Sequence, residues 1–181
     1  PTNTPIPANT PEPTNPPPAT DAPQTSTPTP APTAEAGGEE EYIVVYYISN
    51  PNDILGEFPV KPFDADRLRS HMTNIQSALN TMQANLDAAK GGDAAACSNY
   101  VNAYNNILYS GEFYDDIPGD WQQIDVVYSI SFIYALDRTR PAYLACVNGG
   151  DMGDFNYGLA YTAIGETLNF LNPAIVNAYA K

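Results

Sequence analysis

The chain has 181 residues and a formal net charge of −14, because 21 Asp and Glu residues outnumber 7 Lys and Arg residues. Nucleic acids and anionic membrane surfaces attract basic patches, so neither is an expected partner of this chain. No apolar run approaches the roughly 20 residues of a transmembrane helix, so we expect no membrane insertion.

Residues 1–41 have the composition of a stalk or linker. Of the first 36 residues, 12 are Pro and 9 are Thr. Such a segment buries too little apolar surface to offset the entropy of ordering it, and Pro-rich chains favour extended polyproline II. Thr next to Pro is typical of O-glycosylated stalks, and the alternative is an unmodified flexible linker. The candidate O-glycan sites are Thr2, Thr4, Thr10, Thr14, Thr27, Thr29 and Thr33.

The folded domain is expected at residues 42–181, and its first part, 42–60, is expected to be extended. Residues 42–49 are almost entirely β-branched or aromatic and end at a turn signal, Asn50-Pro51-Asn52-Asp53. This pattern predicts a strand that is buried on both faces. The strand pairs either with 54–60 in a hairpin or with a sheet of another copy. The candidate assembly strand is Tyr42, Ile43, Val44, Val45, Tyr46, Tyr47 and Ile48.

Residues 62–181 predict four helices in an up-down bundle, so the fold class is mainly α with one N-terminal strand or hairpin. The clearest helix begins after Asp64 and ends at Gly91-Gly92. It carries a heptad stripe of Leu68, Met72, Ile75, Leu79, Met82 and Leu86. A second helix follows Asp93 and ends near Gly111. Two further helices begin near Asp120 and Asp154, and we expect Pro141 and Pro173 to kink or break them.

The two cysteines, Cys97 and Cys146, are predicted to form a disulfide. In an up-down bundle the start of the second helix lies beside the end of the third, where these residues fall. An even cysteine count next to a stalk of extracellular composition favours a disulfide over a metal site or redox chemistry.

No residue pattern in the chain indicates catalysis. His71 is the only histidine, no nucleophile motif accompanies it, and we expect it at the surface of the first helix. The loop acids Asp115, Asp116, Asp120, Asp151 and Asp154 offer oxygen ligands for Ca²⁺ but lack the EF-hand spacing. We interpret Asp120 and Asp154 as helix N-caps instead, and expect no cofactor.

Tyrosine is unusually frequent, with 13 residues in the chain. On the second helix Tyr residues alternate with Asn, and such a surface can contact sugars or another subunit. The alternative is that the rings fill the core of the bundle. The residues concerned are Tyr100, Tyr104, Tyr109, Tyr128, Tyr134, Tyr143, Tyr157 and Tyr161, with Asn99, Asn102, Asn105 and Asn106.

The Pro/Thr-rich segment at 1–36 resembles the O-glycosylated stalks of bacterial surface proteins and extracellular glycoprotein fibres. This resemblance implies an extracellular or cell-surface location. The resulting hypothesis is a non-catalytic structural or surface protein, such as a filament subunit, whose strand at 42–49 contacts another copy by β-augmentation. The alternative is a monomeric binding module on a stalk, with a glycan, peptide or small molecule as its ligand.

Overall fold

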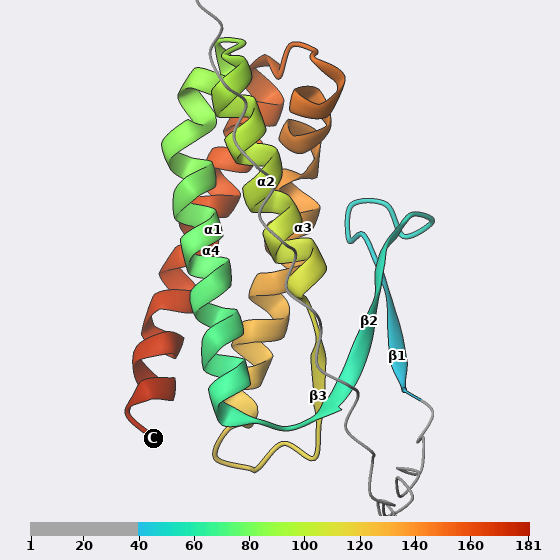
Figure 1. Cartoon of the computed structure of the whole chain (residues 1–181), viewed down its shortest axis with the longest axis vertical. Coiled ribbons are helices and arrows are strands. Elements are labelled where there is room, and N and C mark those ends of the chain that lie inside the picture. Colours follow the sequence, from blue (N-terminus) through green and yellow to red (C-terminus); the bar gives the residue numbers. More distant parts are fainter. Residues whose placement is uncertain (1–39) are drawn as a thin grey trace, which may run out of the picture. The chain divides into compact units, whose positions relative to one another are not determined.

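The computed structural model describes residues 40–181, and in this part of the chain four helices form a bundle beside a small sheet (Figure 1). The helices are α1 (Ala65–Lys90), α2 (Ala94–Ser110), α3 (Gln122–Asn148) and α4 (Gly153–Tyr179). Each packs on the next, and α4 also packs on α1. Short turns join α1 to α2 and α3 to α4, so these neighbours run antiparallel. The prediction of a mainly helical bundle is confirmed.

The first two helices begin where the sequence pattern places them. The side chain of Asp64 accepts the backbone N–H of Arg67 at 2.9 Å, and that of Asp93 accepts the N–H of Ala96 at 2.8 Å. Both are N-caps that satisfy free donors of the first helical turn. The whole predicted stripe of α1 is buried against the other helices.

The expected breaks at Pro141 and Pro173 are wrong, because α3 and α4 run through these residues. A proline in a helix interior costs about 3 kcal/mol, but tertiary packing routinely exceeds local propensity. Around Pro141, the hydroxyls of Tyr100 and Tyr104 on α2 donate to the carbonyls of Thr139 and Leu136. These contacts fasten the turn before the proline to α2.

The expected caps at Asp120 and Asp154 are also wrong. Neither Trp121 nor Met152, the residues at the starts of α3 and α4, makes a side-chain capping bond. Asp120 pairs with Lys181 at 3.0 Å, and Asp154 pairs with Lys90 at 2.5 Å. Asp151 instead accepts the backbone N–H of Gly153 at 2.9 Å. Asp120 and Asp154 therefore pair with distant lysines instead of capping their helices.

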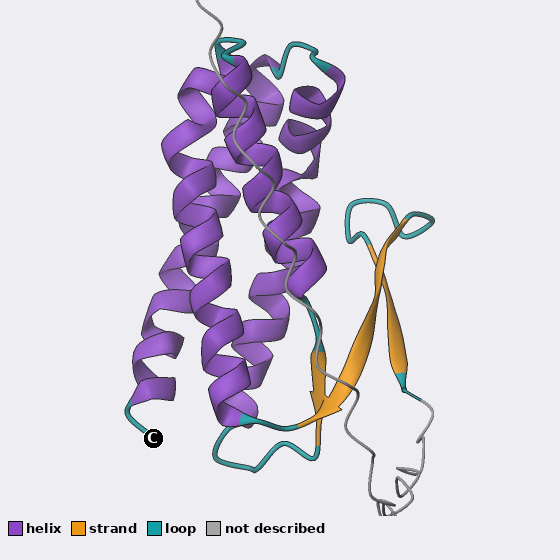
Figure 2. Cartoon of the chain, viewed as in Figure 1, coloured by secondary structure: helices purple, strands orange, loops and turns teal. Residues whose placement is uncertain are grey.

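The sheet has three strands in the order β1-β2-β3 (Figure 2). β1 (Tyr42–Tyr46) and β2 (Ile54–Pro62) form the hairpin, with Ile43 opposite Phe58. The third strand, β3 (Phe113–Asp115), pairs with β2 in parallel and was not predicted. It has only three residues, too few to give a periodic pattern, and it forms because the α2–α3 connection passes the end of β2.

Aromatic rings join the sheet to the bundle. Phe132 of α3 is fully buried, and its ring lies 5.0 Å from that of Phe58 and 6.0 Å from that of Phe113. Both pairs have the edge-to-face geometry that aromatic rings favour. Gly111 is required here for space, since a Cβ atom at this position would lie 2.1 Å from Cζ of Phe132.

The predicted disulfide between Cys97 and Cys146 is present. Cys97 lies in the first turns of α2 and Cys146 in the last turn of α3, as the antiparallel arrangement of these helices requires. The bond closes a loop with a sequence separation of 49 residues. It therefore links the two halves of the bundle at one end.

Candidate interaction surface

β1 is an edge strand whose outer side pairs with no other strand of the described residues. The backbone N–H of Val60 donates to the Glu41 carbonyl, and the N–H of Tyr47 donates to the Asp53 carbonyl, so the groups of Glu41 and Tyr47 face β2 on both sides of the register shift between Val45 and Tyr46. In an antiparallel ladder, alternate residues direct their N–H and C=O groups toward the partner strand. The odd-numbered residues therefore face β2. The backbone groups of Tyr42, Val44 and Tyr46 point outward, away from the sheet.

One face of the hairpin is exposed and mostly apolar, and it also carries Glu57 of β2, which lies opposite Val44. Its five large side chains are each 42–55% exposed: Tyr42, Val44, Tyr46, Ile48 and Ile54. The opposite face contacts the bundle through Val45 and Tyr47, which are buried. The prediction that the strand is buried on both faces is therefore wrong. A continuous β-branched and aromatic sequence does not distinguish a central strand from an edge strand with one apolar face in solvent.

A buried carboxylate holds the tip of the hairpin on α3. The Oδ1 atom of Asp137 accepts the backbone N–H and the hydroxyl of Ser49, both at 2.8 Å. Its Oδ2 atom lies 3.4 Å from Nε of Arg138, and the Asp137 side chain is completely buried. A buried carboxylate that lost these partners would be costly, so Asp137 strongly favours this hairpin position. No sequence pattern had indicated this residue.

A second contact fixes the same tip. The hydroxyls of Tyr47 and Tyr104 lie 3.3 Å apart, and the guanidinium of Arg140 lies 4.0 Å above the Tyr47 ring. Arg140 also pairs with Asp53 at 2.6 Å. Burial and the hydrogen bond to Tyr47 raise the pKa of Tyr104 far above its ordinary value, so this hydroxyl stays protonated. The hairpin is thus anchored on one face and open on the other.

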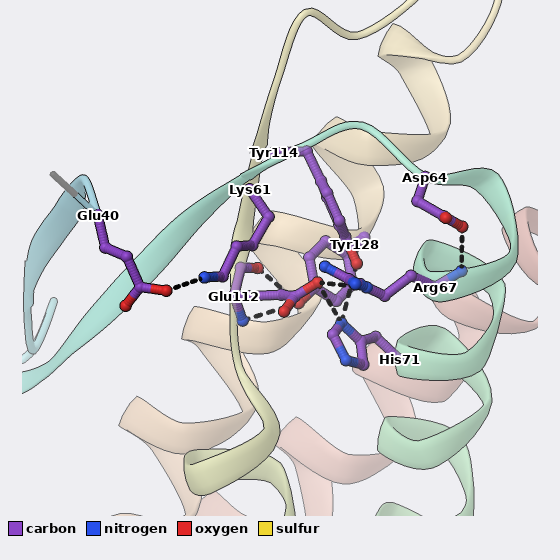
Figure 3. A network of polar contacts seen from close by, with 8 residues as sticks. All are labelled: Glu40, Lys61, Asp64, Arg67, His71, Glu112, Tyr114 and Tyr128. Carbon is purple, nitrogen blue, oxygen red and sulfur yellow. Dashed lines mark hydrogen bonds and ion pairs between the residues drawn. The ribbon is translucent and has the colours of Figure 1, made fainter. Parts of the chain in front are cut away.

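A polar cluster lies at the base of the sheet, where β3 meets α1 and α3 (Figure 3). The Tyr114 hydroxyl lies 3.0 Å from Nδ1 of His71, and Oε1 of Glu112 lies 3.8 Å from the same atom. Nε of Arg67 lies 3.6 Å from that oxygen, and the Tyr128 hydroxyl donates to the Glu112 carbonyl at 2.8 Å. These contacts fasten β3 to the two helices.

The expectation that His71 lies at the helix surface is wrong, since its side chain is only 15% exposed. Burial lowers the pKa of His71, whereas the Glu112 carboxylate acts in the opposite direction and Arg67 adds to the lowering. The neutral imidazole is therefore favoured near pH 7, where it can share a proton with the Tyr114 hydroxyl. Its contacts are those of a residue that positions β3.

Some of the tyrosines fill the core of the bundle and others lie at its surface, so each of the two interpretations of the sequence holds for part of the set. Tyr100, Tyr104 and Tyr128 are fully buried core residues, whereas Tyr109 and Tyr161 are exposed. Tyr143 stacks on Tyr104, while Tyr134 and Tyr157 donate to Glu166 and Asp87.

A polar groove of about 380 Å³ runs between α1 and α2. Ala78 and Ala103 form its floor, and no charged side chain lines it. Its polar lining consists of Asn74, Ser77, Thr81, Asn99, Asn102, Asn106 and Ser110.

The remaining predicted sites have no structural counterpart in residues 40–181. The seven candidate O-glycan threonines, Thr2, Thr4, Thr10, Thr14, Thr27, Thr29 and Thr33, lie outside the described residues. Within the described part of the chain, no three His, Cys, Asp or Glu side chains gather where they could hold a metal ion. None of the four helices is long and apolar enough to cross a membrane.

A comparison with protein-family models, with curated proteins and with solved structures found no match to this chain.

Proposed function

We propose that this chain is a non-catalytic extracellular structural or surface protein whose folded domain self-associates through the open edge of β1. The observation that carries the proposal is the edge itself, an uncharged strand with outward backbone groups and an exposed apolar face. Natural proteins block exposed edge strands with Lys, Pro, bulges or a covering segment. β1 contains no Lys or Pro, and although its pairing with β2 shifts register between Val45 and Tyr46, residues 42–45 keep a regular register, which favours use of this edge for pairing.

An extracellular location is supported by two independent features. The Cys97–Cys146 disulfide is compatible with an oxidising compartment. The Pro/Thr-rich composition of residues 1–36 is typical of O-glycosylated stalks that hold a domain away from a surface. Assembly into a filament remains a prediction of the sequence, and it requires a further contact besides β1.

Val44→Pro in the full chain tests the proposal. The substitution removes one outward N–H, and a proline is tolerated on an edge strand where that group faces solvent. Because pairing loses at least one central hydrogen bond and the ring obstructs approach, we expect self-association to weaken roughly tenfold or more. Sedimentation velocity over a concentration series measures this, and circular dichroism checks that the fold is retained.

Val44→Thr is the matched control. It keeps the N–H group and the β-branched shape, so it should associate nearly as wild type does. Wild-type protein that stays monomeric at all concentrations, or Val44→Pro protein that associates as strongly as wild type, would contradict the proposal.

The polar groove between α1 and α2 favours a second function, the binding of a neutral glycan. Asn74, Asn102 and Asn106 present uncharged amides over a floor of two alanines, and neutral polyols are bound by such donors and acceptors. We expect Asn102→Ala with Asn106→Ala to abolish binding on an array of neutral oligosaccharides. Asn177→Ala on α4, also exposed, is the control. Equal binding by both variants, or none by wild type, would contradict this function.

A further inference from the structure

We infer that the partner of β1 is β1 of a second copy, antiparallel to it and related by a two-fold axis at Val44. This inference rests on the proposed function and adds the partner, the register and the symmetry of the contact. It follows from the directions of the backbone groups, from the order of side chains along the strand and from the positions of the flanking charges.

The backbone favours an axis at Val44. Only residues with outward groups can form hydrogen-bonded pairs with a new strand, and these are Tyr42, Val44 and Tyr46. An axis at Val44 pairs Val44 with itself and Tyr42 with Tyr46 of the other copy, so all three outward residues are used. An axis at Ile43 or Val45 leaves one of the three opposite a residue outside the strand.

The side chains follow the same symmetry. The strand reads Tyr-Ile-Val-Val-Tyr, which is nearly the same in both directions. In this register Tyr42 lies opposite Tyr46 on the exposed face, and Ile43 lies opposite Val45 on the other face. Aromatic and β-branched residues are favourable cross-strand partners. The apolar exposed faces of the two hairpins thereby become one continuous surface.

The charges permit this approach although the chain is strongly acidic. β1 has no charged residue, and Glu40 beside it pairs with Lys61 at 2.6 Å. In the Val44 register the two Glu41 residues are six positions apart along the strands, a distance of roughly 20 Å. The two Glu57 residues, which lie opposite Val44 on β2, are nearer, at three strand spacings or roughly 14 Å. Both distances exceed the Debye length of about 8 Å at physiological salt, so the repulsion within each pair is screened.

The symmetry limits what the contact builds. Pairing through a two-fold axis uses the same edge of both copies, so it closes after two subunits. The two three-stranded sheets become one continuous sheet with β3 at each outer margin. This contact therefore makes a dimer.

Single cysteines in the full chain test the register. Opposite residues of a hydrogen-bonded pair have Cα atoms about 5.5 Å apart, within disulfide range. We expect Val44→Cys to give a covalent dimer on mild oxidation. Tyr46→Cys alone should give none, because its partner is Tyr42, but an equal mixture of Tyr42→Cys and Tyr46→Cys proteins should cross-link. Non-reducing gels with wild-type protein as the control measure this.

The outcomes separate this inference from the proposed function. A dimer in sedimentation that cross-links through Tyr46→Cys alone, or not at all through Val44→Cys, overturns the register while self-association stands. A monomer at every concentration, whether because residues 1–39 cover the edge or because another protein supplies the strand, overturns both. Cross-linking in the predicted pattern supports both.

Discussion

Replacing Phe132 with alanine will lower the free energy of unfolding by about 3–5 kcal/mol, the usual range for a buried phenylalanine. The ring is fully buried and lies against Phe58 of β2, Phe113 of β3 and Tyr128 of its own helix. Its removal leaves a cavity where the sheet meets the bundle. The surrounding rings are held by their own contacts, so we expect little collapse into that space.

Urea denaturation followed by circular dichroism measures the effect. Phe170→Ala on α4 is the control, because this ring is 70% exposed, and its loss should change the free energy of unfolding by no more than about 0.5 kcal/mol. A loss of less than about 1 kcal/mol for Phe132→Ala would mean that the ring is not packed between the sheet and the bundle.

Replacing both Cys97 and Cys146 with serine will lower the free energy of unfolding by about 4 kcal/mol. The disulfide closes a loop with a separation of 49 residues, and the chain-entropy model assigns about this value to its restriction of the unfolded state. An effect of this size is a large share of the stability of a single domain.

Wild-type protein that is reduced and alkylated while unfolded provides an independent comparison. Its free energy of unfolding should be close to that of the double serine variant. Adding reductant should leave the free energy of unfolding of the double serine variant unchanged. Equal stability of oxidised wild type and the serine variant would contradict a stabilising disulfide in the native protein.

The helices could be predicted from the sequence where an apolar stripe and a cap coincide. In α1, the stripe from Leu68 to Leu86 and the Asp64 cap agree with the structure. The helix breaks expected at Pro141 and Pro173 are absent. The energetic cost of a proline in a helix can be estimated from the sequence, but the tertiary contacts that offset this cost cannot. Asp120 and Asp154 were expected to cap helices for the same reason, because their lysine partners lie far away in the sequence.

The strand and the turn after it could be predicted, but the sequence left open whether the strand pairs within the chain, and it did not indicate what covers the strand. The β-branched and aromatic run at 42–48 indicated a strand, and the turn at 50–53 indicated where it ends. Whether such a strand is central or at an edge depends on what covers it, which is a property of the assembled fold. Asp137 was missed because a single acidic residue in a helix does not indicate a partner as distant in the sequence as Ser49.

Hydrogen exchange at the Val44 amide tests the self-association of β1 most directly. In dilute full-length protein this amide faces solvent and should exchange rapidly, while the Ile43 and Val45 amides are protected by β2. Raising the protein concentration should slow exchange at Tyr42, Val44 and Tyr46 together, with Ile43 and Val45 unchanged. Exchange at Val44 that stays equally fast at every concentration would contradict pairing through this edge.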